Sequence, residues 1–181
     1  MLIEKPGNIL RDSMTLGSVQ LERDVLVEFY FPEGMPDMTE AALLLFNDGQ
    51  DLERMGIADM LAGLYGRELL SPLLCAGIHA GADRKMEYGT AGRPDYRGWG
   101  TKADAYTRFI FDELLPAIRE RYHAPSFREK AFAGFSLGAL SAMDIVWRHP
   151  QEFVRAGLFS GSFWWRTRDK NDPAYCESTD R

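Results

Sequence analysis

The sequence is poor in cysteine and has no excess of positive charge. It contains two cysteines in 181 residues, Cys75 in an apolar run and Cys176 in a polar tail. Two isolated thiols are too few for a disulfide framework or a structural zinc site, so we expect both to be free. The net charge is −6, and no cluster of Lys and Arg stands out. This argues against a partnership with nucleic acid or with an anionic membrane.

The amino terminus also lacks the unbroken apolar segment of a secretory signal. Glu4, Lys5, Arg11 and Asp12 interrupt it, so we expect a cytoplasmic protein. The length and a hydrophobic content of 45% suit one compact domain, residues 1–181. Nothing in the sequence indicates an oligomeric state.

Short apolar runs alternate with helical patterns along the chain. The first two predicted strands form a hairpin with a charged turn at residues 22–24, and a long loop is predicted from Gly81 to Gly100. The helix predicted at residues 101–122 should bend at Pro116. This alternation predicts an α/β fold, a mainly parallel sheet with helices on both faces. Strands are predicted at residues 13–21, 24–31, 41–47, 70–79, 130–135 and 153–161, and helices at 52–65, 101–122 and 137–149.

The stretch AGFSLGAL holds Gly134, Ser136 and Gly138 in a G-x-S-x-G frame. The motif follows an apolar strand and precedes a helix of small residues, which is the setting of a nucleophile elbow. Glycines are needed there because the turn is sharp and the strand and helix pass close together. We therefore predict Ser136 as a nucleophile. The alternative is a tight glycine turn with an idle serine.

An elbow needs two backbone N–H groups that bind an oxyanion. One comes from the residue after the nucleophile and one from the loop after the third strand. These correspond to Leu137 and to the loop NDGQD, in which Gln50 is the best candidate. Asp48 could instead form an acidic wall of the site. The same loop is equally typical of a turn that caps the following helix, with Asp51 as the N-cap.

Four segments in order, LLLFNDGQDLE, DELLPAIRERY, FAGFSLGALSAM and GLFSGSFWW, resemble the putative esterase family of the α/β-hydrolase fold. That family includes esterase D, feruloyl esterases and enterochelin-type esterases. The resemblance implies an α/β-hydrolase-like three-layer sandwich that hydrolyses a small-molecule carboxylic ester through an acyl-enzyme. It further implies Ser136 as nucleophile, Leu137 and Gln50 as oxyanion donors, and Ser160 and Gly161 as part of the loop beside the site.

A serine hydrolase also needs a histidine, and the chain has three. His149 ends the helix that starts at the motif, about 20 Å from Ser136. His123 precedes the strand that leads to Ser136 and so lies at the opposite edge of the sheet. His79 lies at the correct edge, but with the strand order of the family it is two strand spacings away, about 9.6 Å. None is expected to serve as the base.

In α/β-hydrolases the acid and the histidine follow the serine along the chain. The polar tail of this sequence, residues 166–181, offers neither a histidine nor a strand. We therefore expect the amino-terminal two thirds of an esterase, with carboxyl-terminal strands, acid and histidine lying beyond residue 181 and negligible activity in this chain alone. Asp169, Asp172 and Asp180 are expected to be solvated. The alternative function is a non-catalytic binding or scaffold protein.

Specificity is expected to come from the loop at 81–100 and from the end of the last strand. Tyr88 and Trp164 are predicted to line the substrate site, although Trp164 could equally pack against other protein. Arg84 and Glu87 are expected to form a surface ion pair that fixes the loop.

We expect no metal ion and no other cofactor. A metal hydrolase that uses His79, Asp83 and Glu87 is possible on residue types alone. Their spacing matches no ligand motif, however, and a flexible loop would have to order itself around the ion.

Overall fold

The computed structural model of the chain describes residues 8–35 and 37–180. Glu4 and Lys5, on which the expectation about a signal segment partly depends, lie outside these ranges. Among the described residues, no helix combines the length and the apolar character needed to cross a lipid bilayer.

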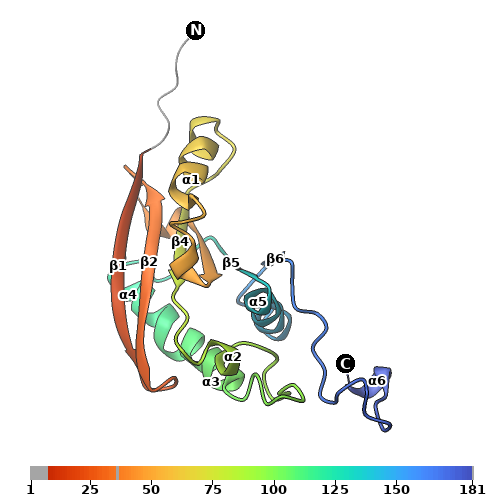
Figure 1. Ribbon diagram of the computed structural model, residues 1–181. Coiled ribbons are helices and arrows are strands. Elements are labelled where there is room, and N and C mark those ends of the chain that lie inside the picture. The colour runs from red at the N-terminus through yellow and green to blue at the C-terminus, as the bar shows by residue number, and fades with distance from the viewer. Residues whose placement is uncertain (1–7, 36, 181) are drawn as a thin grey trace.

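Six strands form one sheet in the order β1-β2-β4-β3-β5-β6 (Figure 1). The β1–β2 and β2–β4 pairs are antiparallel, and the β4–β3, β3–β5 and β5–β6 pairs are parallel. The predicted amino-terminal hairpin and the mainly parallel α/β sheet are therefore confirmed. The strands are β1 Ile9–Ser18, β2 Arg23–Pro32, β3 Ala42–Asn47, β4 Leu73–Ile78, β5 Glu129–Phe135 and β6 Arg155–Phe159.

Two buried clusters on opposite faces of the sheet show why these strands form. On one face Val25, Val27 and Phe29 of β2 are fully buried, as their alternation predicts. On the other face Tyr30 of β2 and Cys75 of β4 belong to a second, smaller cluster. Because β3 and β4 send side chains into both clusters, their sequences are continuous apolar runs rather than alternating ones.

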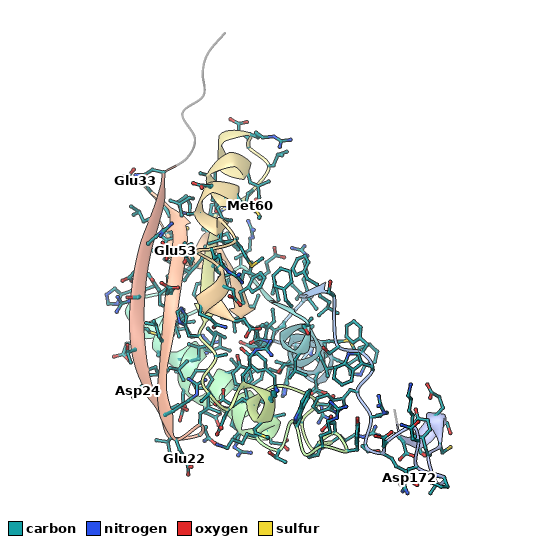
Figure 2. All side chains as sticks on the ribbon, in the orientation of Figure 1. Glu22, Asp24, Glu33, Glu53, Met60 and Asp172 are labelled. Carbon is teal, nitrogen blue, oxygen red and sulfur yellow. The ribbon has the colours of Figure 1, made fainter. Side chains whose placement is uncertain are left out.

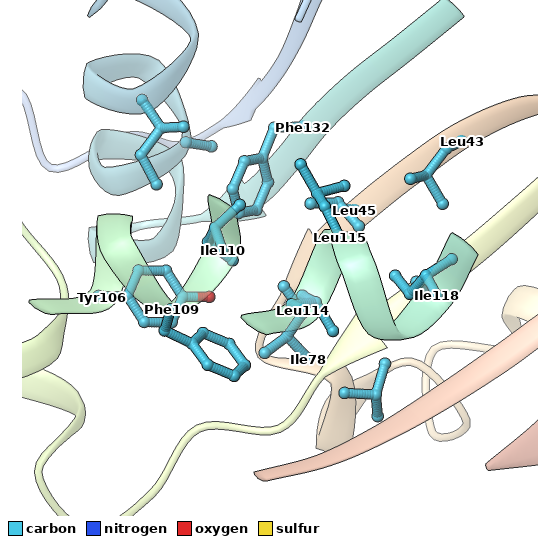
Figure 3. Close-up of a cluster of buried hydrophobic side chains, with 14 of the residues drawn as sticks. Leu43, Leu45, Ile78, Tyr106, Phe109, Ile110, Leu114, Leu115, Ile118 and Phe132 are labelled. Atoms are coloured by element: carbon cyan, nitrogen blue, oxygen red, sulfur yellow. The ribbon is translucent and has the colours of Figure 1, made fainter. Parts of the chain in front are cut away.

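Helices cover both faces of the sheet. The smaller cluster includes Leu61 of α1, and the larger one includes Ile110, Leu115 and Ile118 of the segment before β5 (Figure 3). The arrangement has three layers, as in the predicted sandwich. The helices are α1 Ile57–Gly66, α2 Arg84–Glu87, α3 Ala103–Arg108, a π-helix Phe109–Leu114, α4 Leu115–Arg121, α5 Leu137–Arg148 and α6 Glu177–Asp180, with one-turn 3-10 helices at Met38–Glu40 and Gly49–Asp51.

The helix predicted to start at Leu52 begins later, at Ile57. Gly56 precedes it in a left-handed conformation with φ 73°, so the N-cap is Gly56 and not Asp51. Leu52 is nevertheless buried. The apolar spacing from Leu52 onward therefore indicates which residues are buried, but not that they form one continuous helix.

The long helical segment before β5 is irregular, but the irregularity lies ahead of Pro116. Phe109–Leu114 forms a π-helix, and Pro116 then lies in the first turn of α4. Proline cannot donate a backbone hydrogen bond, and its ring crowds the carbonyl of residue 112. A wider helical turn just before the proline relieves that crowding.

Candidate active site

Ser136 lies at the sharp turn between β5 and α5, and its side chain is exposed. Its backbone has φ 51° and ψ −117°, a conformation that is strained for a residue with a Cβ. The strand, turn and helix expected around the motif are therefore all present.

The two glycines of the motif stand where a side chain would not fit. A Cβ on Gly134 would lie 2.6 Å from the carbonyl carbon of Gly138. A Cβ on Gly138 would lie 2.9 Å from Oδ2 of Asp48 and 3.0 Å from Cβ of Asn47. The first glycine thus lets α5 turn back against β5, and the second lets α5 approach the end of β3.

The end of β6 and the loop after it hold the backbone of Ser136 from both sides. The N–H of Ser136 donates to the carbonyl of Phe159 at 3.0 Å, and the N–H of Ser162 donates to the carbonyl of Ser136 at 3.0 Å. The Oγ atoms of Ser136 and Ser162 are 3.1 Å apart, and Ser162 is 4% exposed. Ser162 was not among the predicted site residues, although it belongs to the same SGS tripeptide as Ser160.

The two predicted oxyanion donors lie at neighbouring chain segments. Leu137 is the first residue of α5, so its N–H belongs to the helical groups that have no partner four residues earlier. Gln50 lies in the 3-10 turn that follows β3, the strand paired with β5. Its side-chain Oε1 accepts from the N–H of Ala80 at 3.0 Å, which directs the side chain toward the end of β4. The backbone N–H of Gln50, and not its side chain, is the predicted oxyanion donor.

Asp48 does not present a free acidic wall. It is 5% exposed, and Arg84 donates to its two carboxylate oxygens at 2.5 and 2.7 Å. The Asp48 carboxylate raises the pKa of Arg84 through these hydrogen bonds, so the guanidinium stays charged. The ion pair neutralises the carboxylate and fixes α2 above the end of β3.

Tyr88 is fully buried, and its hydroxyl accepts from the N–H of Asp48 at 3.2 Å. Burial raises the pKa of this hydroxyl, which therefore stays protonated. The ring packs edge-on against Tyr106, with centroids 5.2 Å apart. Because the side chain has no exposed surface, it supports the loop after β3 instead of lining an open pocket.

The expected ion pair between Arg84 and Glu87 is wrong. Glu87 is completely buried and binds Arg23 of β2 through two hydrogen bonds of 2.7 Å. The first and last residues of α2, Arg84 and Glu87, thus each form a bidentate pair with a residue far away in the sequence. The separations are 64 residues for Arg23 and Glu87 and 36 for Asp48 and Arg84. No local pattern could have indicated either pair.

The two adjacent tryptophans have different environments. Trp164 is 46% exposed and meets Trp99 edge-on, with centroids 6.3 Å apart, whereas the Nε1 of the buried Trp165 donates to the carbonyl of Arg93 at 2.8 Å. A cavity of about 350 Å³ lies beside Trp165 and is also lined by Leu140 of α5. Leu140 is one helical turn from Ser136, so this cavity adjoins the motif.

None of the three histidines is hydrogen-bonded to Ser136 in the described part of the chain. Nε2 of His79 is 2.8 Å from Oε2 of Glu28, which lies on β2. Since the strand order is β2-β4-β3-β5, this contact directs the imidazole away from β5. His149 caps the end of α5, and its ring packs at a tilt of 46° against Phe111, with centroids 4.3 Å apart. His123 follows α4 with φ 50°.

The residues considered as metal ligands do not converge. His79 contacts Glu28, Asp83 pairs with Lys102 at 2.6 Å, and Glu87 pairs with Arg23. Within residues 8–35 and 37–180, no group of three or more His, Cys, Asp or Glu side chains is arranged to hold a metal ion.

The aspartates of the tail differ from one another. Asp172 is exposed on the segment that extends away from the sheet (Figure 2). Asp180 was expected to be solvated, but it is buried. The N–H of Cys176 donates to it at 2.8 Å and Oγ1 of Thr167 at 3.1 Å. The hydrogen bond from Cys176 is the main cause of its lowered pKa. The single turn of α6 brings the Asp180 carboxylate back to the backbone N–H of Cys176.

Comparison with known proteins gives consistent matches. Residues 18–180 match the family Esterase, described as "Putative esterase". A siderophore triacetylfusarinine C esterase from Aspergillus fumigatus is 32% identical over 65 residues, which are 36% of this chain and 22% of that protein.

Among solved structures, the enterochelin esterase of Shigella flexneri is similar with a TM-score of 0.71 and 23% identity over 90% of this chain. An IroE-like serine hydrolase from Shewanella oneidensis is similar with a TM-score of 0.71 and 22% identity over 86% of this chain. The chain spans 39% of the first of these proteins and 52% of the second. At these identities the likeness shows a shared fold.

Proposed function

From the finding that the chain belongs to the Esterase family, described as "Putative esterase", we propose that it hydrolyses carboxylic esters with Ser136 as the nucleophile. The observation that carries the proposal is the conformation of Ser136. An exposed serine is held at a positive φ of 51° directly before a helix, between two glycines where a Cβ would come within 3.0 Å of neighbouring atoms. Strain of this kind persists where a function requires it.

The mechanism proceeds through an acyl-enzyme. Oγ of Ser136 attacks the ester carbonyl carbon while a base accepts the hydroxyl proton, and the carbonyl oxygen becomes an oxyanion. The backbone N–H groups of Leu137 and Gln50 bind that oxyanion, each contributing about 3 kcal/mol to the lowering of the barrier. The intermediate collapses as the base protonates the departing alcohol. Water then attacks the acyl-serine while the base takes one of its protons. The second tetrahedral intermediate releases the acid as the base returns that proton to Oγ of Ser136.

The base of this mechanism is proposed to come from outside the 181 residues. The support is structural: His79 contacts Glu28, the ring of His149 packs against Phe111, and His123 follows α4. In α/β-hydrolases the acid and histidine follow the nucleophile along the chain. We place both in a later part of the same α/β-hydrolase domain, of which residues 1–181 form the first part.

The substrate is proposed to be a small-molecule ester. Two of the similar proteins are named as an enterochelin esterase and a siderophore triacetylfusarinine C esterase. Siderophore esters are therefore the first candidates to assay. Trp164, exposed near the motif, and the cavity of about 350 Å³ beside Leu140 are proposed to contact the substrate.

A fluorophosphonate probe tests the nucleophile directly, because it phosphonylates an activated serine hydroxyl. We expect the full-length gene product to be labelled at Ser136, with no labelling of a folded Ser136→Ala variant. Ser71→Ala is the matched control, since Ser71 is an exposed serine near the start of β4, at the opposite edge of the sheet. An intact, folded protein that takes up no label would refute the proposal and favour a non-catalytic binding protein.

A further inference from the structure

The end of β6 and the loop that follows it contact Ser136 on both its backbone N–H and its carbonyl. Two backbone hydrogen bonds of 3.0 Å hold it: its N–H donates to the carbonyl of Phe159, the last residue of β6, and its carbonyl accepts from the N–H of Ser162 in the loop. Ser160, one of the two residues between these partners, has a positive φ of 49°. The loop is therefore bent so that it meets Ser136 from the side of β6.

The side chain of Ser162 completes this contact. Its Oγ is 3.1 Å from Oγ of Ser136, and the residue is 4% exposed. In the part of the chain that the structure describes, Ser136 is the only hydrogen-bond partner of the Ser162 hydroxyl. A buried hydroxyl needs a partner, so the contact is strongly favoured over an open rotamer.

We propose that the Ser162 hydroxyl is a positioning residue for Ser136, a role that rests on the proposed function of Ser136 as the nucleophile. Ser162 donates its proton to Oγ of Ser136 and fixes the rotamer of that side chain. The proton of Ser136 then remains free to point toward the base, because each hydroxyl has only one proton to donate.

The direction of this hydrogen bond matters for the reaction. If Ser136 donated to Ser162, its proton would be turned away from the base and the bond would have to break before attack. With Ser162 as the donor, the bond persists while Oγ of Ser136 loses its proton to the base and bonds to the carbonyl carbon. The contact thus holds the attacking atom in one position and reduces the entropic cost of the step.

The variant Ser162→Ala separates the hydroxyl from the rest of the loop. The backbone N–H of residue 162 still donates to the carbonyl of Ser136, so the loop keeps its main anchor. Ser162→Thr restores a hydroxyl on the same carbon. Ser141→Ala is the matched control, because Ser141 is 2% exposed on α5 and has no hydrogen bond to Ser136.

The experiment measures fluorophosphonate inactivation of the full-length gene product, with the binding constant KI and the maximal rate kinact determined separately. Loss of one hydrogen bond that is made in the transition state corresponds to a rate change of about tenfold. We expect Ser162→Ala to lower kinact by that factor without changing KI. Ser162→Thr should recover most of kinact, and Ser141→Ala should match the wild type. Thermal unfolding verifies that each variant is folded.

Two results would overturn the positioning role. One is an unchanged kinact in Ser162→Ala, and the other is a folded Ser162→Thr that is as slow as Ser162→Ala. If Ser162→Thr does not fold, the split between kinact and KI in Ser162→Ala decides alone. A wild-type protein that is never labelled would instead refute the nucleophile and, with it, this role. Labelling lost in Ser136→Ala but unaffected in Ser162→Ala would refute only the positioning role.

Discussion

The side-chain amide of Asn47 donates a hydrogen bond of 2.8 Å to the carbonyl oxygen of Gly138, and so joins the end of β3 to the first turn of α5. Asn47 is completely buried, and its Oδ1 accepts from the hydroxyl of Tyr106 at 2.5 Å. Gln50 follows Asn47 closely in the chain, and Leu137 directly precedes Gly138. One buried amide therefore fixes the relative position of the two segments that carry the proposed oxyanion donors.

Replacing Asn47 by alanine should destabilise the fold markedly. The carbonyl of Gly138 and the hydroxyl of Tyr106 would both lose a buried partner, and each unsatisfied group costs about 1–3 kcal/mol. We expect the free energy of unfolding to fall by about 2–4 kcal/mol in Asn47→Ala, as measured by urea denaturation. Tyr106→Phe leaves only Oδ1 of Asn47 without its partner and should lose less. Equal stability of Asn47→Ala and the wild type would contradict the role of this amide.

Two glycines with different surroundings should respond oppositely to a methyl group. In Gly134→Ala the new Cβ would lie 2.6 Å from the carbonyl carbon of Gly138, which is backbone and cannot move aside cheaply. We expect a loss of stability of about 1–3 kcal/mol, the usual cost of overpacking.

Gly63→Ala is the matched control, because Gly63 lies within α1 and no atom outside its own helical turn stands within 4 Å of the place that a Cβ would take. Alanine has a higher helix propensity than glycine, so this change should stabilise the protein by up to about 1 kcal/mol. Thermal denaturation of both variants checks the pair. A Gly134→Ala protein with the stability of Gly63→Ala would show that α5 does not turn tightly against β5.

Acid should remove the contribution of Asp12. Arg121 of α4 donates to its carboxylate at 2.6 and 2.8 Å and Tyr122 at 2.9 Å, and the hydrogen bonds from Arg121 are the main cause of its lowered pKa. A pKa that is lower in the folded state stabilises the fold above the unfolded value, about 3.9, and this contribution is lost as pH falls through the folded value.

The variant Asp12→Asn tests this linkage. Both side chains of the pair are about one third exposed, so we expect Asp12→Asn to be less stable than the wild type by about 0.5–1 kcal/mol at pH 7. The difference should shrink as the pH falls through the folded pKa of Asp12, because protonation then removes the charge from the wild type as well. Urea denaturation at a series of pH values measures it, and a difference independent of pH would count against the ion pair.

Local sequence patterns were sufficient for the sheet and for the motif. The apolar run that ends at Asn47 became a central strand, and the spacing of Gly134, Ser136 and Gly138 correctly placed a sharp turn between a strand and a helix. These features depend on neighbouring residues, so a short window of sequence contains the information. The start of α1 was misplaced because the apolar period continues across Gly56, whose left-handed backbone interrupts the helix.

The contacts around the site depend on residues that are distant in sequence, and these were not predictable. Arg84 was expected to pair with Glu87, its neighbour in the chain, but the fold brings Asp48 to one and Arg23 to the other. Ser162 belongs to the SGS tripeptide that was predicted to lie beside the site. Only the bend after β6 shows that its hydroxyl faces Ser136. Such pairs are set by the crossing of strands and loops, which composition and periodicity do not encode.

His79 is the histidine at the same edge of the sheet as Ser136. Its Nε2 is 2.8 Å from the Glu28 carboxylate on β2, and β3 lies between its own strand and β5. His79→Gln keeps a donor for Glu28 but removes the basic nitrogen. We expect the same fluorophosphonate labelling of Ser136 in this variant as in the wild type, and negligible p-nitrophenyl acetate hydrolysis by the 181-residue chain alone. Hydrolysis at ordinary esterase rates that disappears in both His79→Gln and Ser136→Ala would mean that the loop after β4 brings this imidazole to the serine, and the base would then lie within these residues.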